Sequence, residues 1–411
     1  YAQAHSILLT EAPAETFSTV SASKALRDHF RVPSLDSLEI GDLKIGVRAA
    51  GALLSYLIKT QKNALKHITT IQRYYAERFM LLDATAQRSL ELTASLRGRS
   101  RRGTLLWLLD QTMTTMGSRL LRSWIEQPLV SKDDILRRQD AIAHFVDDPF
   151  LRDDLRETMK PIHDIERLLS RIAYATVNAR DCLALLASLK AAPPIAERLK
   201  DSGVARLDEL RAMLDPMDDL AELLERAISP DAPLSVKEGG IIKDGYSQEL
   251  DEYRSASTNG KAWLTNLEAQ EREATGIKNL KIGFNRVFGF YIEVTKSFYD
   301  LVPARYVRKQ TLAACERFIT DELKDLEKKI LGAEESATRL EYQLFLKIRE
   351  TLDASLTRLS RVSKALKEID ALLALAEAAV DNNYVRPNIN EEGILEIEGG
   401  RHPVVEKALG H

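Results

Sequence analysis

The sequence is poor in cysteine, in aromatic residues and in long apolar runs. Its 411 residues include two cysteines, Cys182 and Cys315, which lie far apart and outside any CxxC or Cys/His spacing. We therefore expect neither a structural zinc site nor a disulfide framework, and a reducing cytosol fits. No stretch reaches the roughly 18 uninterrupted apolar residues typical of a membrane span, so we expect no membrane partner.

Motifs for nucleotide chemistry and catalysis are also missing from these residues. No GxxxxGK[ST] phosphate loop occurs, and no Ser/His/Asp or Cys/His set has motif context. Carboxylates such as Asp164 and Glu166 follow an ordinary amphipathic helical pattern, which gives no reason to assign them acid–base roles. We therefore expect no enzyme activity, metal or cofactor in this chain itself.

Helix-forming sequence is what the chain has in abundance. Leucine, alanine, arginine and glutamate are common, and aromatic residues make up 6% of the chain. Apolar residues recur at helical spacing over most of its length, so the predicted fold class is mainly α. Ser131 with Asp134 three positions later has the spacing of a helix cap. Residues 79–92 are an exception, since their short-period apolar pattern suggests a strand.

Two long helical stretches flank a segment of another kind. Residues 246–274 carry an apolar face, and residues 320–381 contain no proline, which predicts a single helix about 90 Å long. Apolar residues between Leu323 and Leu344 alternate steps of three and four, as in a coiled-coil seam. We expect the two stretches to pair as long antiparallel arms.

The segment between the arms alternates with period two. Phe290, Ile292 and Val294 fall on one face of the predicted strand, and the polar residues between them fall on the other. Gly289 tolerates the positive φ that a tight turn needs. We therefore predict a small antiparallel β-sheet inserted at the tip of the two long antiparallel helices.

This segment is also strongly basic. Residues 278–317 contain eight basic and three acidic residues, a net charge of +5, whereas the whole chain carries −3. A local excess of this size indicates a polyanion, and a nucleic-acid phosphate backbone is the best candidate. Charge runs often do no more than solvate a surface, so a helical scaffold that binds other proteins through its arms stays open as an alternative.

Four stretches of the chain, taken together, resemble the bacterial mismatch-repair MutS family. They are LRGRSRRGTLLWLLDQTMTTMGSRLLRSWIEQPL, KIGFNRVFGFYIEVTK, YVRKQTLAACERFITDELKDLEKKILGAEE and EIEGGRHPVVE. The resemblance implies the end of a connector domain (1–45), core and lever helices (46–260), a clamp domain (261–319), returning lever helices (320–385) and the start of an ATPase domain (386–411). A member of the MutS-like paralogue family that suppresses recombination is the alternative, but such proteins typically lack the clamp.

The family's backbone-gripping clamp positions fall on Asn285, Lys309 and Arg317. The resemblance and the charge pattern together give the candidate DNA-binding residues Lys281, Asn285, Arg286, Arg308, Lys309 and Arg317. Arginine offers forked donors to phosphate oxygens, lysine a point charge and asparagine an amide donor. Two further family positions, commonly polar or basic, are Ala313 and Ala314 here.

The resemblance also implies partners and cofactors for a longer parent protein. Such a parent is expected to be an ATPase that uses ATP and Mg²⁺ and that encircles mismatched double-stranded DNA as a homodimer. It is expected to recruit a MutL-type repair protein and to be cytoplasmic, in association with the nucleoid. The mismatch-reading domain and the phosphate loop of the family are not found in this sequence.

Overall fold

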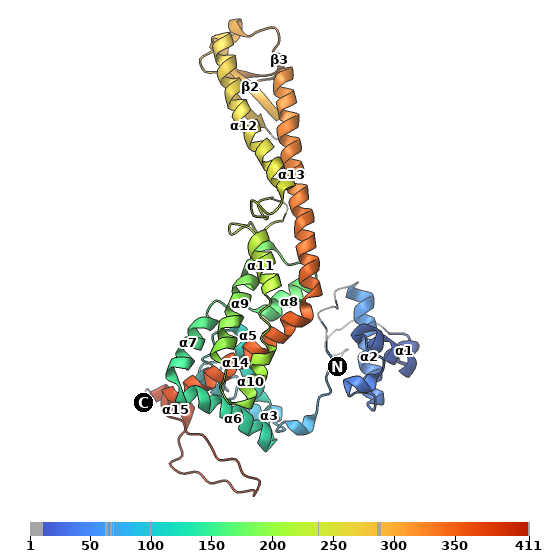
Figure 1. The fold of residues 1–411 in the computed structure, drawn as a ribbon, viewed down its shortest axis with the longest axis vertical. Coiled ribbons are helices and arrows are strands. Elements are labelled where there is room, and N and C mark those ends of the chain that lie inside the picture. The colour runs from blue at the N-terminus through green and yellow to red at the C-terminus, as the bar shows by residue number, and fades with distance from the viewer. Residues whose placement is uncertain are drawn as a thin grey trace. The chain divides into compact units, whose positions relative to one another are not determined.

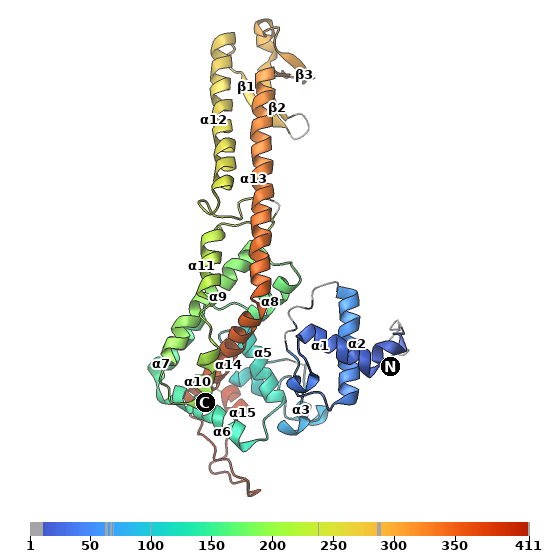
Figure 2. The same ribbon diagram turned by 45° about the vertical axis from the view of Figure 1, so that its right-hand side comes forward.

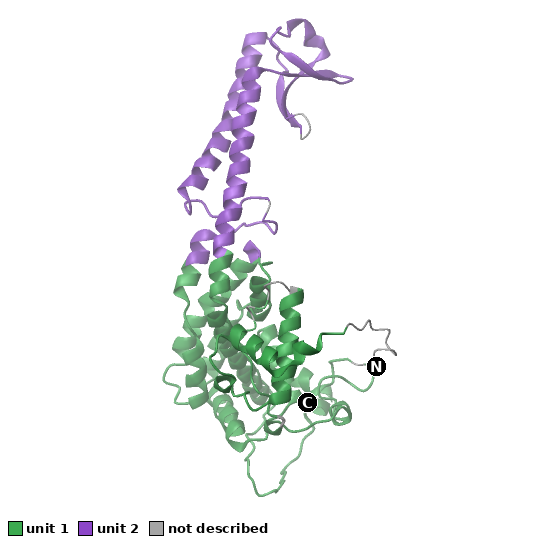
Figure 3. Cartoon of the chain, turned by 90° about the vertical axis from the view of Figure 1, so that its right-hand side faces the viewer, with its two compact units in different colours: residues 1–177, 181–222, 349–411 green, residues 178–180, 223–348 purple. Residues whose placement is uncertain are grey.

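The computed structural model describes residues 11–61, 65, 68, 70–98, 100–236, 238–285 and 289–409. The chain divides into two units, coloured separately in Figure 3. Unit 1 comprises residues 1–177, 181–222 and 349–411, and unit 2 comprises residues 178–180 and 223–348. Unit 2 is therefore an insertion in the sequence of unit 1.

The fold is mainly α with a four-stranded antiparallel sheet, which confirms the predicted class. Figure 1 shows the described elements coloured in chain order, with labels on many of them. They are η1 (Ala14–Phe17), α1 (Thr19–Phe30), η2 (Leu35–Leu38), α2 (Lys44–Gln61), η3 (Ala76–Arg78), α3 (Ala84–Ser89), α4 (Leu105–Leu109), α5 (Thr115–Glu126), α6 (Lys132–Asp147), α7 (Pro149–Met159), α8 (Ile165–Ala173), α9 (Ala179–Arg198), α10 (Ala205–Met213), α11 (Asp218–Ala227), α12 (Gln248–Thr275), β1 (Lys281–Asn285), β2 (Gly289–Thr295), η4 (Lys296–Leu301), β3 (Val307–Thr311), β4 (Cys315–Ile319), α13 (Asp321–Ala354), α14 (Leu356–Asp381) and α15 (Pro403–Leu409).

Helix α14 forms the centre of the helical core of unit 1. Helices α4, α5, α6, α7, α8 and α10 pack against it (Figure 1). Ten of its fourteen residues from Ala365 to Ala378 are apolar, a proportion typical of a helix that is buried in a core. The residues in this stretch are accordingly buried almost throughout.

A buried carboxylate joins α14 to the start of α5. Asp370 is fully buried and accepts hydrogen bonds from the backbone N–H groups of Met113 and Thr114, each at 2.8 Å, and from the Thr114 hydroxyl at 2.6 Å. Gly117 makes room for this carboxylate, since a Cβ there would lie 2.2 Å from Asp370 Oδ2. Burial raises the pKa of Asp370, although the hydrogen bonds from Thr114 oppose the shift.

Near the N-terminus, α1 and α2 pack on each other around their own apolar cluster. Leu26 of α1 and Val47 and Leu54 of α2 are buried there together. Ser18 caps α1 by accepting from the backbone N–H of Ser21 at 3.1 Å. This packing joins α1 and α2 through one apolar cluster.

Two sequence predictions outside the sheet were wrong. Residues 79–92 contain a short helix, α3 (Ala84–Ser89), and no strand, because the Asp83 carboxylate caps the helix by accepting from Ala86 N–H at 2.6 Å. Phe79 makes only an isolated bridge to Leu129. Residues 320–381 form two helices, because Ser355 interrupts the pattern. The Ser355 N–H bonds the carbonyl of Leu352, and its hydroxyl bonds the carbonyl of Thr351, so the last turn of α13 tightens.

The long helices of unit 2 lie side by side in antiparallel directions, as Figures 1 and 2 show. Ser257 of α12 donates to Glu334 of α13 at 3.1 Å, and Arg254, further from the sheet, bonds Glu341 at 2.8 Å. Residue numbers fall along one helix as they rise along the other, so the predicted antiparallel pairing is confirmed. The sheet joins the C-terminal end of α12 to the N-terminal end of α13.

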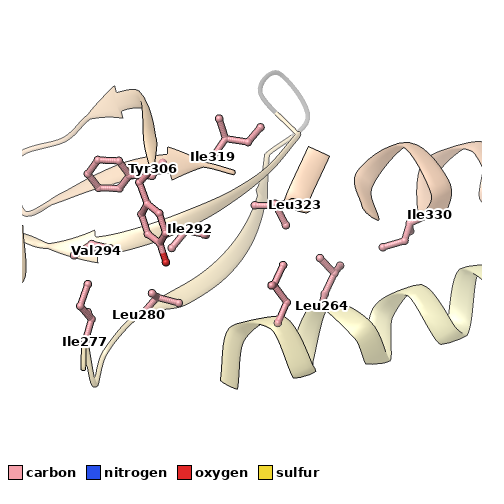
Figure 4. Close-up of a cluster of buried hydrophobic side chains, with 11 residues drawn as sticks. Leu264, Ile277, Leu280, Ile292, Val294, Tyr306, Ile319, Leu323 and Ile330 are labelled. Atoms are coloured by element: carbon pink, nitrogen blue, oxygen red, sulfur yellow. The ribbon is translucent and has the colours of Figure 1, made fainter. Parts of the chain in front are cut away.

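A cluster of buried side chains fixes the sheet onto these two helices (Figure 4). Ile292 and Val294 of β2 point into the cluster and are fully buried, as the period-two pattern predicted. Leu264 of α12 and Leu323 of α13 approach from the helical side. Thr320, between β4 and α13, caps the helix by accepting from Leu323 N–H at 3.2 Å.

Candidate nucleic-acid interface

The four strands are arranged in the order β1-β2-β4-β3, and carboxylates from both long helices hold the sheet in place. Glu268 of α12 accepts from Ile282 N–H at 2.8 Å, and Glu327 of α13 accepts from Phe290 N–H at 3.1 Å. Gly289 has φ +77°, and a Cβ there would lie 2.1 Å from Glu327 Oε1. Glycine is therefore required at this position both by the backbone conformation and by the close approach of the carboxylate.

One row of polar side chains crosses all four strands on the face away from the apolar cluster. Lys281 pairs with Glu293, Glu293 with Arg317, and Arg317 with Gln310 in the strand register. Arg317 donates to Glu293 at 3.2 Å and to Gln310 at 3.0 Å, and its guanidinium lies 4.1 Å from the ring centroid of Tyr291. Its side chain is only 20% exposed. These contacts anchor Arg317 firmly within the sheet.

Each arginine in the described part of this basic segment has an acidic partner close by. Three ion pairs account for them: Arg305 with Glu271 at 2.5 Å, Arg308 with Glu316 at 2.9 Å and Arg317 with Glu293 at 3.2 Å. Glu271 and Glu316 are buried, so their charges need these partners. A large part of the arginine charge therefore neutralises carboxylates of the sheet and of α12.

The lysines of the segment differ from the arginines. All four are exposed, and their ammonium groups have no hydrogen-bond or ion-pair partner among the described residues: Lys278, Lys281, Lys296 and Lys309. Lys309 is the extra residue of a β-bulge, because Arg308 pairs with Phe318 and Gln310 with Arg317. The charge that the sheet offers to a ligand is thus carried mainly by lysine.

Three titratable side chains in and around the sheet have raised pKa values. Burial raises the pKa of the Cys315 thiol, and the neighbouring Glu293 raises it further. Burial also raises the pKa of Tyr306, whose hydroxyl donates to Glu271 at 2.8 Å. Burial and the nearby Glu316 have the same effect on the pKa of Tyr299. These three side chains therefore stay protonated and uncharged at neutral pH.

Comparison with protein families agrees with this architecture. The family model described as MutS domain III matches residues 85–376, and the model described as MutS domain II matches residues 2–69. The first match alone covers more than half of the chain. The chain belongs to the MutS family.

Several curated relatives, each named DNA mismatch repair protein MutS, match almost the whole chain. The protein from Lachnoclostridium phytofermentans is 46% identical over 393 residues, which cover 96% of this chain and 42% of the relative. The protein from Symbiobacterium thermophilum is 47% identical, with 96% and 45% covered, and the protein from Geobacillus thermodenitrificans is 50% identical, with 87% and 40% covered. The chain spans less than half the length of these MutS relatives.

The sheet brings together most of the residues that the MutS resemblance singled out. Lys281 and Arg317 lie in one row, and Arg308 and Lys309 are neighbours on the exposed strand β3. Asn285 ends β1 opposite Gly289 and is half-buried. Of the six candidates, Arg286 lies outside the described residues.

Two exposed lysines were counted in the basic charge but were not among the candidate residues. Lys278 precedes β1, and Lys296 follows β2. Lys296 is the last residue of the MutS-like stretch KIGFNRVFGFYIEVTK and Lys278 lies just before it, so their charge was the signal that could have marked them. Ala313 and Ala314 are exposed in the turn between β3 and β4, where they add no charge to the surface.

Metal and membrane features can be assessed over the described ranges. Within them, no group of three or more His, Cys, Asp or Glu side chains is placed to hold a metal ion. Across the same ranges, no helix combines the length and the apolar character needed to cross a membrane.

Proposed function

We propose that unit 2 grips double-stranded DNA by its phosphate backbone, without reading base sequence, as part of a DNA mismatch-repair protein. The observation that carries the proposal is a set of four exposed lysines in and beside the sheet that have no acidic partner among the described residues. The described arginines of the same segment are paired with carboxylates of unit 2. A lysine ammonium is a compact point charge suited to phosphate oxygens, and it carries no geometric code for a base edge. The names of the MutS relatives support the link to mismatch repair.

The arrangement of the arms supports a mechanical role for the sheet. The α12–α13 pair is long, and the sheet is fixed to it by apolar packing and by Glu268 and Glu327. A phosphate-binding surface held in this way moves with the helices and does not swing on a loose linker. Such a unit can link DNA contacts at the sheet mechanically to the long helices, without any chemical reaction at the contact.

Salt dependence tests this function directly. Each phosphate that the protein neutralises contributes about −0.9 to the slope of log K against log salt, so four lysine contacts predict a slope of about −3.6. Binding of a labelled blunt duplex to the 411-residue chain should follow this slope between about 50 and 200 mM salt. Two duplexes of unrelated sequence should bind equally. A chain that retained no duplex at low salt would instead be a helical scaffold.

Further properties of a protein with the length of the MutS relatives belong to the same proposal. They are ATPase activity with ATP and Mg²⁺, a homodimer that encircles the duplex, and a MutL-type repair partner. A cytoplasmic, nucleoid-associated location follows from the DNA ligand. The present sequence contains no GxxxxGK[ST] loop, so ATP would be held by residues outside these 411.

A further inference from the structure

A pocket in unit 1 is lined by more cations than acids. It lies among α5, α6, α10, α14 and residues 72–79, and its volume is about 490 Å³. Its charged lining residues are Arg78, Arg137, Arg138, Arg206 and Lys364, with the acids Asp134 and Glu368. The pocket is remote in sequence from the basic sheet and plays no part in the proposed duplex binding.

Three of the five cations are already neutralised by carboxylates. The pairs are Arg78 with Asp134 at 3.2 Å, Arg206 with Glu368 at 2.6 Å, Arg206 with Glu209 at 2.8 Å, and Arg137 with Glu209. Three acids thus serve three arginines. Arg138 and Lys364 are left over, and neither has a hydrogen-bond or ion-pair partner in the described part of the chain.

Of the two cations, Arg138 is the stronger indication of an anion-binding site. Its guanidinium lies 3.8 Å from the ring centroid of Trp124, which fixes its plane. Burial lowers the pKa of Arg138 to about 10, and the neighbouring Arg206 adds to this effect, although Glu368 and Asp134 oppose it. A cation that has lost much of its water without forming a direct ion pair is costly, and a bound anion would reduce that cost.

We propose that this pocket binds a phosphate-bearing anion, either inorganic phosphate or the phosphate group of a small phosphate monoester, through Arg138 and Lys364. The two uncompensated positive charges match the charge of about −1.5 to −2 that such a phosphate carries at neutral pH. The fixed guanidinium plane offers forked donors to two phosphate oxygens, and Lys364 adds a point charge. Neutral polar groups of Ser123, Gln127 and Gln72 also line the pocket and can complete the hydrogen bonding.

Calorimetric titration of the 411-residue chain tests the site with two probes, inorganic phosphate and phenyl phosphate. Sodium chloride at matched ionic strength provides the reference. Saturable binding of one or both probes supports the proposal, and the tighter probe identifies the source: phenyl phosphate if the remaining pocket volume holds an ester group, inorganic phosphate if it does not. Absence of saturable binding by both probes overturns it.

Lys364→Gln is the decisive variant, because Arg138→Gln also removes the packing on Trp124 and can unfold the core. Lys364 is exposed, so its loss should leave the melting temperature in chloride unchanged. Affinity for the tighter probe should fall at least fivefold. Lys24→Gln, an exposed lysine on α1 outside the pocket, should bind as the wild type does. Equal affinity in the wild type and Lys364→Gln would contradict the assignment.

Discussion

Gly260 of α12 lies directly against Ile330 of α13, and the two helices pack closely at this pair. A Cβ on Gly260 would lie 2.3 Å from Ile330 Cγ1, well inside the contact distance of real side chains. Ile330 is only 1% exposed, so it has no open space into which it can retreat. The missing side chain on one helix therefore makes room for the buried isoleucine on the other.

Replacing Gly260 by alanine should destabilise unit 2 even though alanine favours helix. The intrinsic gain in helix propensity is about 1 kcal/mol. Overpacking a closed contact typically costs about 1–3 kcal/mol, so we expect a net loss in the free energy of unfolding. Chemical denaturation of the wild type and Gly260→Ala, followed by circular dichroism, measures the difference.

Gly332, in α13, provides the matched control. No heavy atom lies within 4 Å of a Cβ built at this position. Gly332→Ala should therefore show the propensity gain alone and raise stability by up to about 1 kcal/mol. If the two variants changed stability in the same direction, the close packing of Gly260 on Ile330 would not be the cause.

Lys309 and Arg317 should respond differently to loss of charge. Lys309 is exposed on a bulge, so Lys309→Gln should change stability by less than about 0.5 kcal/mol. It should reduce the salt slope of duplex binding by about 0.9, the share of one phosphate contact. Binding titrations at several salt concentrations measure this slope, and Lys24→Gln should leave it unchanged.

Arg317→Met should instead lower the stability of unit 2. It breaks the bonds from Arg317 to Glu293 and Gln310 and leaves a half-buried carboxylate without its partner. Loss of charged hydrogen bonds of this kind costs about 1.5–3 kcal/mol when they are buried. Solvent screens this partly exposed pair, so we expect a loss of about 1 kcal/mol in the free energy of unfolding. A variant that weakened duplex binding at unchanged stability would assign Arg317 to the DNA and not to the sheet.

The sequence was sufficient to predict the sheet because local patterns specify it. Alternation in residues 290–294 and the glycine at 289 mark strand and turn within a few positions. The pairing of the long helices followed in the same way from apolar spacing. In contrast, Ser355 ends α13 through hydrogen bonds that serine also makes in uninterrupted helices, so its effect had no distinct signal in the sequence.

Which cations remain available for a ligand could not be predicted from the sequence. Arg305 is paired with Glu271, a residue 34 positions earlier in α12, and this partner is known only once the helix and sheet have packed. The charge count treated arginine and lysine alike. The ion pairs in the folded structure distinguish the arginines from the lysines. For the same reason, no sequence motif could mark Arg138 as a cation without an ion pair.

Asp370→Asn should destabilise unit 1, with a dependence on pH that is unusual for an aspartate. The amide has one acceptor oxygen, and its NH₂ group faces the donors of Met113 and Thr114, so we expect a loss of about 2–3 kcal/mol. Because burial raises the pKa of Asp370 above its ordinary value of 3.8, the protonated carboxyl is favoured by folding. The wild type should therefore gain stability relative to the variant as the pH falls from above the raised pKa toward 3.8.

Denaturation curves of both proteins across this pH range provide the measurement. The difference between the two free energies of unfolding isolates Asp370, because the other titrating groups are common to both proteins. A difference that shrank on acidification would mean that folding favours the charged carboxylate, and that its hydrogen bonds outweigh its burial.

Arg119→Met should show the opposite pH dependence in the same unit. Arg119 donates to both oxygens of Asp164 at 2.8 Å and to Glu166 at 2.7 Å, which joins α5 to α8. The hydrogen bond from Arg119 lowers the pKa of Asp164 below its ordinary value of 3.8, so this stabilisation is present above pH 3.8 and is lost as the pH falls through the lowered pKa. Arg119 is half exposed, so screening limits the expected cost to about 1 kcal/mol at pH 7, falling toward zero in acid.

Arg122→Met, which removes only an exposed pair with Glu126 on the same helix, should cost less than about 0.5 kcal/mol at pH 7. Equal costs for the two variants would show that the link between α5 and α8 contributes nothing beyond an ordinary surface ion pair.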